Sequence, residues 1–376
     1  MESQPLYFRL TVKLMLLALI LFLLSVGREL LIPFATALLF TFLLLPISER
    51  LEKTGVPRWL AIIVSILLAA LVFGGIVYFF ISQVMSFRQD LPLIKEQFVE
   101  KGARLLSYIE TRFRIPQHKQ MEWLRQRAST SASGGGGVLL SVFATTGTLL
   151  ASLALIPIFI FFLTYFREKY KTFITLIITH EEKQQRALGI AQKVSTVGQK
   201  YIKGIMIDIA ILSVLNSTGF MLLGIPHAIL FGVLASMLNI IPYVGVLIGS
   251  ALPVMMALIT QDQIGYALGA LGVCLFVQFL DNNFITPYVV GSSVSINPLT
   301  ATMALIASAM VWGIPGMILC IPFVGMIKVV CDNVESLKPY GYLLGEEVDY
   351  RQRDSLQRRM MSTIRGRMRK GETPAP

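Results

Sequence analysis

The sequence predicts an all-α polytopic membrane protein, and three observations support this fold class. Of its 376 residues, 55% are hydrophobic and 15% are charged, whereas soluble domains carry about 25% charged residues. The mean hydropathy is +0.68, and the apolar residues form long runs. Prolines and glycines interrupt some of these runs, which predicts about eight transmembrane segments of which some are broken or re-entrant.

The net charge of +11 does not indicate a nucleic-acid partner, because the basic residues lie between and beyond the apolar runs. Lysine and arginine beside membrane spans are typical of the cytoplasmic side, so we expect the lipid bilayer to be the partner of this chain. Cys274, Cys320 and Cys331 lie in or beside predicted spans, and their spacing gives neither a disulfide framework nor a metal motif. We expect no cofactor and no metal.

Residues 12–45 are predominantly apolar and carry the charged pair Arg28-Glu29 near their middle. One straight helix of this length would measure roughly 50 Å, which exceeds the roughly 30 Å hydrocarbon layer. We therefore predict a tight hairpin of two spans, 12–26 and 30–45, with the charged pair at the outer turn.

A third span is predicted from Trp59 to about Phe80, so that residues 1–85 hold the first three transmembrane helices. Residues 86–137 are polar and carry apolar residues at helical spacing, which predicts an amphipathic helical insertion. Its many basic residues favour the cytoplasm, whereas the hairpin topology favours the outside. We expect an extracytoplasmic insertion, because the positive-inside rule weakens for loops of this length.

Residues 138–203 are predicted to hold the fourth span, 138–166 with a kink at Pro157, and a basic cytoplasmic segment. Within that segment the apolar residues Leu188, Ala191, Val194 and Tyr201 line one helical face. This pattern is typical of a helix that lies on the membrane surface. A helix that packs against neighbouring loops has the same pattern, and the sequence does not distinguish the two.

Residues 204–340 are predicted to form a core with broken helices. Its spans are 205–223, the long interrupted segment 228–259, 265–280, and 300–330, which is broken at Gly313-Ile314-Pro315-Gly316. The basic tail, 341–376, should be cytoplasmic. With both termini inside, the chain must cross an even number of times, so we expect 228–259 to cross only once.

The stretch 239–299 organises this core, because prolines and glycines break its helices at one level. Broken helices near the middle of a membrane are how many transporters build substrate sites, and this pattern indicates a permease. The polar residues could equally hydrogen-bond neighbouring helices, and the glycines could serve close helix packing. The predicted pathway residues are Asn239, Pro242, Tyr243, Gly245, Gly249, Pro253, Gln278, Asp281, Asn283, Pro287, Gly291 and Pro298.

Two carboxylates in the predicted spans, Asp208 and Asp281, are candidates for ion coupling. A charge within the hydrocarbon layer costs about 2.5–3.5 kcal/mol on insertion scales, so it usually has a function. Asp281 could instead be a solvated helix end, and Asp208 could pair with Lys203 or Lys200 at the membrane surface.

The core motifs resemble those of the autoinducer-2 exporter family of bacterial permeases. The resemblance covers about 203–330 and rests on the order and spacing of its motifs. Three departures are Val246, where the family commonly has proline, Asn297, where it commonly has histidine, and Ser292-Ser293, where the region is often basic. The motifs are Leu223-Gly224-Ile225-Pro226, Asn239-Ile240-Ile241-Pro242-Tyr243-Val244-Gly245, Thr286-Pro287-Tyr288-Val289-Val290-Gly291, Asn297-Pro298-Leu299 and Gly313-Ile314-Pro315-Gly316.

This resemblance implies a homo-oligomeric, multi-pass transporter of the bacterial inner membrane that exports a small polar molecule. It also implies an alternative, Na⁺(Li⁺)/H⁺ antiport, in which H⁺ or Na⁺ is a partner. A third hypothesis is a non-transporting scaffold that binds partners through the insertion 86–137. We expect no enzyme, because the three histidines lie on separate segments and no nucleophile motif surrounds them.

Overall fold

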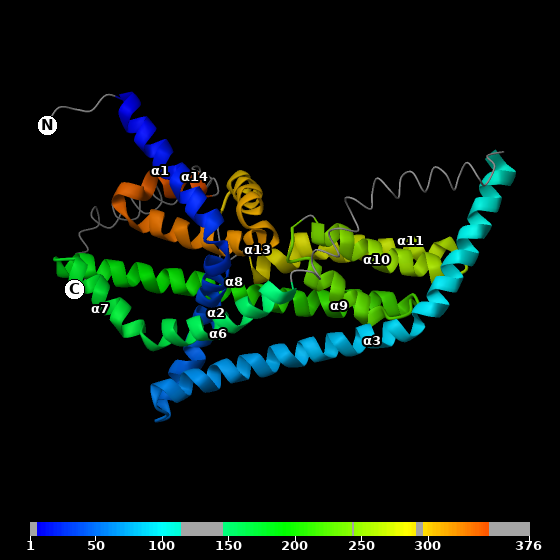
Figure 1. The fold of residues 1–376 in the computed structure, drawn as a ribbon, viewed down its shortest axis with the longest axis horizontal. Helices are drawn as coiled ribbons and strands as arrows, with labels where there is room; N and C mark the ends of the chain where they lie inside the picture. Colours follow the sequence, from blue (N-terminus) through cyan, green and yellow to red (C-terminus); the bar gives the residue numbers. More distant parts are fainter. Residues whose placement is uncertain (1–5, 114–145, 243, 291–295, 346–376) are drawn as a thin grey trace, which may run out of the picture.

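The computed structural model describes residues 6–113, 146–242, 244–290 and 296–345 (Figure 1). Every named element in these ranges is a helix, which confirms the predicted all-α class. Five of the helices are long and apolar enough to cross a membrane: Arg28–Lys53, Arg58–Arg104, Glu181–Leu222, Ile264–Val289 and Pro298–Asn333. Residues 114–137 of the predicted insertion and 346–376 of the basic tail lie outside the described residues, as do Tyr243 and Gly291.

The first two helices, α1 (Leu6–Val26) and α2 (Arg28–Lys53), are separated by Gly27 alone. The Gly27 N–H donates to the Leu23 carbonyl at 2.8 Å, and the Leu31 N–H donates to the Gly27 carbonyl at 2.9 Å. Because this helical ladder continues through the junction, the predicted hairpin is wrong: α2 runs onward from α1 (Figure 1). Arginine and glutamate are good helix formers, so the charged pair extends the helix instead of turning it.

The third helix does not end near Phe80. Instead, α3 continues without a break from Arg58 to Phe113, so the predicted insertion begins as a direct extension of the span. Pro92 lies inside α3 without ending it. The extension lies along the bundle, because Ile94 is buried in a core cluster with Phe220 and Phe231 (Figure 1).

Next in the chain come α6 (Thr146–Tyr165), which contains Pro157, and α7 (Arg167–Ile177). The long α8 (Glu181–Leu222) joins the predicted surface helix and the predicted fifth span into one helix. Val194 in its first half packs against a cluster formed by α2 and α13 residues, such as Leu39 and Leu319. This half of α8 therefore packs against neighbouring helices, and it is not a separate helix on the membrane surface.

The predicted sixth segment is a hairpin of two short helices, α9 (Ala228–Leu238) and α10 (Val244–Thr260). Gly245 lies against the Leu238 carbonyl, and a Cβ at Gly249 would lie 2.9 Å from the Cα of Ala235, so the helices run antiparallel. Only glycine permits such close backbone contact.

The predicted break near Pro242 is confirmed, but the prediction that this segment crosses the membrane once is wrong. The 11 residues of α9 correspond to a length of about 16 Å, roughly half of a hydrocarbon layer. The segment is therefore a re-entrant hairpin that returns to the side from which it starts.

The remaining helices complete the core. The α11 helix (Ile264–Leu280) continues into a π-helix, η1 (Asp281–Ile285), and the short α12 (Thr286–Val289). The predicted break in the last span is confirmed, since α13 (Pro298–Asn333) is kinked at Gly313, whose φ is 62° and ψ is −139°. The described chain closes with η3 (Glu335–Leu337) and α14 (Lys338–Leu344).

Candidate ion and solute site

The side chains of Asn239, Gln278 and Thr286 converge on Asp281, the first residue of the π-helix η1. Its side chain is only 3% exposed, and it accepts hydrogen bonds from three donors. Asn239 Nδ2, at the turn of the α9–α10 hairpin, donates at 2.9 Å, Gln278 Nε2 at 3.3 Å and Thr286 Oγ1 at 2.6 Å. Single turns of π-helix occur frequently at functional sites. This one brings a buried carboxylate to the tip of the re-entrant hairpin.

The second carboxylate of the site is Asp208, in the middle of α8. It is buried, and its carboxyl group interacts with that of Asp281. Its Oδ1 atom has no hydrogen-bond partner within the part of the chain that the structure describes. Two buried carboxylates side by side repel each other, and a proton or a cation between them relieves that repulsion.

The predicted alternative, an ion pair of Asp208 with Lys203 or Lys200, is not formed. Among the described residues, no lysine or arginine forms a salt bridge with Asp208 or Asp281. The negative charge of the pair is therefore balanced by no basic side chain in the described ranges.

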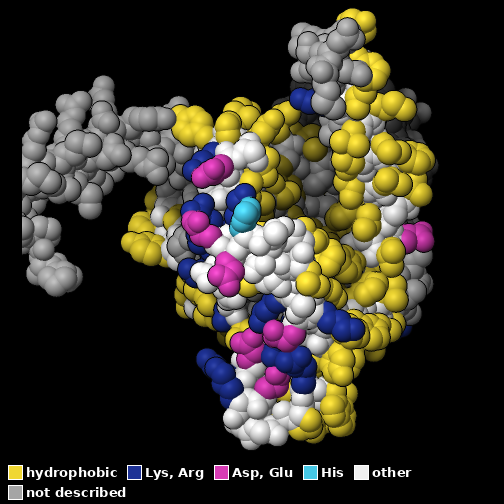
Figure 2. Space-filling view, turned by 90° about the vertical axis from the view of Figure 1, so that its left-hand side faces the viewer, with side chains coloured by type: hydrophobic (Ala, Val, Ile, Leu, Met, Phe, Trp, Pro, Cys, Tyr) yellow, Lys and Arg dark blue, Asp and Glu magenta, His cyan; other side chains and the backbone are white. Residues whose placement is uncertain are grey.

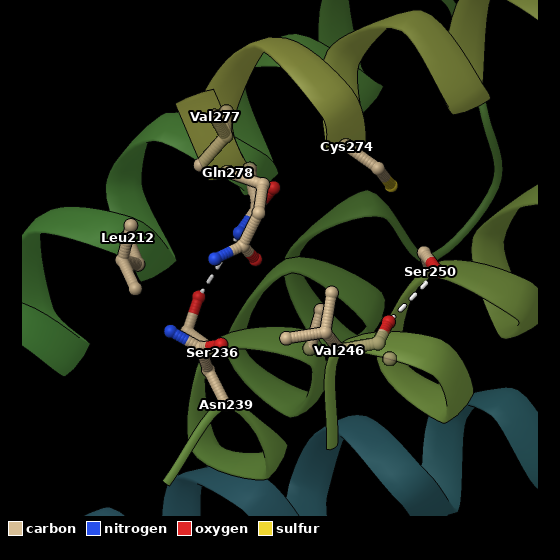
Figure 3. A pocket seen from close by; sticks show the side chains of 11 residues that line it. Leu212, Ser236, Asn239, Val246, Ser250, Cys274, Val277 and Gln278 are labelled. Carbon is tan, nitrogen blue, oxygen red and sulfur yellow. Dashed lines mark hydrogen bonds between the residues drawn. The ribbon is translucent and has the colours of Figure 1, made fainter. Parts of the chain in front are cut away.

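A small cavity of about 30 Å³ lies beside this pair, between α8, the hairpin and α11 (Figure 3). Its wall carries polar groups from each of these elements. Asn216 Nδ2 donates to Ser236 Oγ at 3.2 Å, which joins α8 to α9 across the cavity wall. A space of this size holds a water molecule or a bare cation but no sugar-sized molecule. The polar wall residues are Asn216, Ser236, Asn239, Ser250, Cys274 and Gln278.

The structure therefore brings together four of the predicted polar residues: Asn239, Gln278, Asp281 and Asp208. Gly249 adds a cavity wall without a side chain.

Other predicted residues have packing positions. Pro242 lies in the hairpin turn, Gly245 contacts the Leu238 carbonyl, and Pro253 is buried inside α10. Pro287 lies in the first turn of α12 and Pro298 in that of α13.

Asn283 is not part of the cluster: it is exposed and donates to the carbonyl of Phe279, in its own helix, at 2.8 Å. The sequence interpretation missed Thr286, Asn216 and Ser236. Thr286 lies five residues after Asp281, a spacing that α-helical periodicity does not place on one face. Asn216 and Ser236 gave a detectable signal, since each is a polar residue within an apolar run, Asn216 in the second half of α8 and Ser236 in α9.

Comparison with known proteins decides the family. The family model described as "AI-2E family transporter" matches residues 11–336. The chain belongs to this family. It is thus a membrane transporter or permease with several apolar helices that can span the bilayer, and its family is not a family of enzymes.

Relatives of this AI-2E family transporter are similar over most of their length. The "Putative transport protein YrrI" of Bacillus subtilis is 26% identical over 311 residues, which cover 81% of this chain and 86% of the relative. A "Putative transport protein" of Haemophilus influenzae is 23% identical and covers 87% and 93%. The "Putative permease PerM" of Escherichia coli is 24% identical and covers 80% and 86%. These relatives agree with the motif resemblance in the sequence.

Proposed function

We propose that this AI-2E family transporter exchanges a monovalent cation, Na⁺ or Li⁺, for H⁺ at the Asp208–Asp281 pair. The observation that carries the proposal is a pair of buried, interacting carboxyl groups that no described basic side chain neutralises. Ionisable residues inside membrane segments commonly mark ion pathways and proton relays.

The hydrogen bonds favour different roles for the two carboxyl groups. Asp281 accepts three hydrogen bonds, which solvate its negative charge. Asp208 lacks a partner at Oδ1, so it is the better carrier of the exchanged proton. In this scheme a cation that enters between the carboxylates takes the place of the proton of Asp208, and one H⁺ leaves for each cation bound.

The hairpin would link ion binding to movement. Asn239 lies at the turn of α9–α10 and donates to Asp281, so a change in the charge at Asp281 alters the strength of that contact. Many transporters build their site from broken helices and expose it alternately to two sides by moving one group of helices against another.

A second candidate function is the outward transport of a small polar solute of the autoinducer-2 type. The polar cavity wall supports it, because amide and hydroxyl groups such as those of Asn216 and Ser236 bind hydroxylated molecules. The cavity must then widen during transport. The proposal also includes a homo-oligomer in the bacterial inner membrane, with the basic loop residues Arg50, Lys53 and Arg58 on the cytoplasmic side.

The full-length protein in liposomes that enclose a pH-sensitive dye tests the first function. An inward Na⁺ or Li⁺ gradient should make the lumen alkaline, and Asp208→Asn or Asp281→Asn should abolish the change. Glu182→Gln is a matched control, because Glu182 is an exposed carboxylate on the same helix as Asp208. Wild-type protein that moves no protons with either cation, or an Asp208→Asn variant with full exchange, would contradict the proposal.

A further inference from the structure

The short helix α7 exposes an apolar stripe. Tyr170, Phe173, Leu176 and Ile177 follow helical spacing, all four are exposed, and no residue of α7 is buried. Only Phe166 separates α7 from α6, an apolar helix. Because α6 is apolar and ends where α7 begins, we infer that the stripe lies at the level where α6 leaves the hydrocarbon layer.

Basic side chains surround the first turn of α7. Glu52 near the end of α2 pairs with Arg167 at 2.6 Å and with Arg58 at the start of α3 at 3.6 Å. These contacts place the ends of α2 and α6 and the starts of α3 and α7 at one level. Figure 2 faces this end of the molecule and shows basic and acidic side chains intermixed, with hydrophobic side chains beside them. Lys53, Lys169 and Lys171 add positive charge next to these elements.

Two hydrogen-bond donors of Arg167 lack an acceptor in the described ranges. Its Nη2 donates to Glu52, but its Nε and Nη1 are buried and have no hydrogen-bond partner in the described ranges. Nε lies 3.5 Å from Glu168 Oε1 as an ion pair without a hydrogen bond. A buried guanidinium donor without a partner is costly, and the planar fork of arginine fits the oxygens of a phosphate group.

We propose that Arg167 and Arg58 bind the phosphate of an anionic phospholipid while the apolar stripe of α7 packs among its acyl chains. The charge favours an anionic headgroup, and the direct continuity of α7 with an apolar helix favours a lipid as the occupant. A free phosphate ion would leave the stripe uncovered. A second protein copy would leave the unpaired guanidinium donors unexplained.

Native mass spectrometry of the full-length protein from liposomes of phosphatidylcholine mixed with phosphatidylglycerol tests the headgroup contact. Arg167→Gln should reduce the retained phosphatidylglycerol roughly fivefold, the effect of one basic residue near an anionic surface. Arg186→Gln is the control, since Arg186 is exposed, near the start of α8, and pairs with Glu182. Added inorganic phosphate should not displace the lipid. Equal retention by both variants, or displacement by phosphate, overturns the proposal.

A variant that is expected to retain more lipid, rather than less, separates lipid binding from a structural role of Arg167. Glu52→Gln removes the carboxylate that competes for Arg167 and Arg58, so it should retain more phosphatidylglycerol than wild type. If the Glu52–Arg167 pair only holds the fold, both variants lose lipid alike, which overturns the proposal.

Contact between the apolar stripe of α7 and lipid acyl chains can be measured separately, by tryptophan fluorescence. Phe173→Trp, in a chain whose native tryptophans are replaced by phenylalanine, should be quenched by phosphatidylglycerol with brominated acyl chains. Absence of quenching would mean that protein covers the stripe, and the proposal would be wrong.

Discussion

The side-chain amide of Asn239 donates to the carboxylate of Asp281 across 2.9 Å. This contact joins the turn of a re-entrant hairpin to a π-helix that lies 42 residues later in the chain. Both residues lie where a regular helix ends: Asn239 follows the last residue of α9, and Asp281 is the first residue of the π-helix η1. The hairpin is therefore connected to the charged site through a bond whose strength depends on the charge of Asp281.

Replacement of Asn239 tests this connection. Asn239→Ala should reduce cation-driven proton movement in liposomes about tenfold or more, because a hydrogen bond to a charged group is worth about 1.5–3 kcal/mol. The control is Asn283→Ala, two residues after Asp281, since Asn283 is exposed and bonds its own helix. Asn283→Ala should change the rate less than twofold, and an equal loss in both variants would show that Asn239 has no special role.

The tight contact between α8 and α9 gives a prediction of stability. A Cβ at Gly232 would collide with the side chain and backbone of Ser217, so Gly232→Ala should lower the unfolding free energy by about 1–3 kcal/mol. Thermal unfolding in detergent measures this as a lower Tm. Gly272→Ala, in α11, meets no atom within 4 Å and should raise the Tm or leave it unchanged. A Gly232→Ala protein as stable as wild type would contradict the packing described for this pair of helices.

An indole of α13 bonds the end of α1 to the bundle. Trp312 Nε1 in α13 donates to the Leu24 carbonyl at 2.8 Å. Trp312→Phe keeps an aromatic side chain but removes the donor and part of the packed ring, and the lost hydrogen bond alone should cost about 1 kcal/mol. Backbone amides of α1 should then exchange hydrogen several times faster, while Trp59→Phe, at an exposed position of α3, should leave them unchanged. Unchanged exchange in Trp312→Phe would mean that other contacts hold α1.

The first turn of α7 should respond to acid. The hydrogen bond from Lys171 holds the pKa of Glu168 below the ordinary value of a glutamate. Burial opposes this lowering of the pKa, and the charges of Lys171 and Arg167 add to it. A lowered folded-state pKa stabilises the folded helix above the unfolded-state pKa, and this contribution is lost as the pH falls through the folded value. Because Glu168 is half exposed, the contribution is at most about 0.5 kcal/mol.

Glu168→Gln should therefore cost this small amount at neutral pH and nothing in strong acid. Hydrogen exchange of the α7 amides as a function of pH measures the difference. A cost that is equal at both pH values would rule out an ionic origin.

The apolar runs and their breaks were predictable from sequence, because each depends on local chemistry. Pro242 and Gly313 mark real interruptions, and α11 ends at Leu280 as predicted. The sequence did not predict whether the chain continues or reverses at each break. At Gly27 and after Leu238 this depends on which helices pack together. The site was partly predictable for the same reason. Asp208 and Asp281 were evident as charges in apolar runs, whereas their pairing required the fold, and Thr286 required the altered π-helical pitch.

The in-line junction at Gly27 makes α1 and α2 one rod that is longer than the membrane is thick. The rod from Leu6 to Lys53 is about 70 Å long, more than twice the hydrocarbon thickness, yet its first helix is mostly apolar, with Arg9 and Lys13 near its start, and largely exposed. A rod of this length cannot lie perpendicular to the membrane without exposing apolar side chains to water. It must tilt through the lipid beside its own bundle.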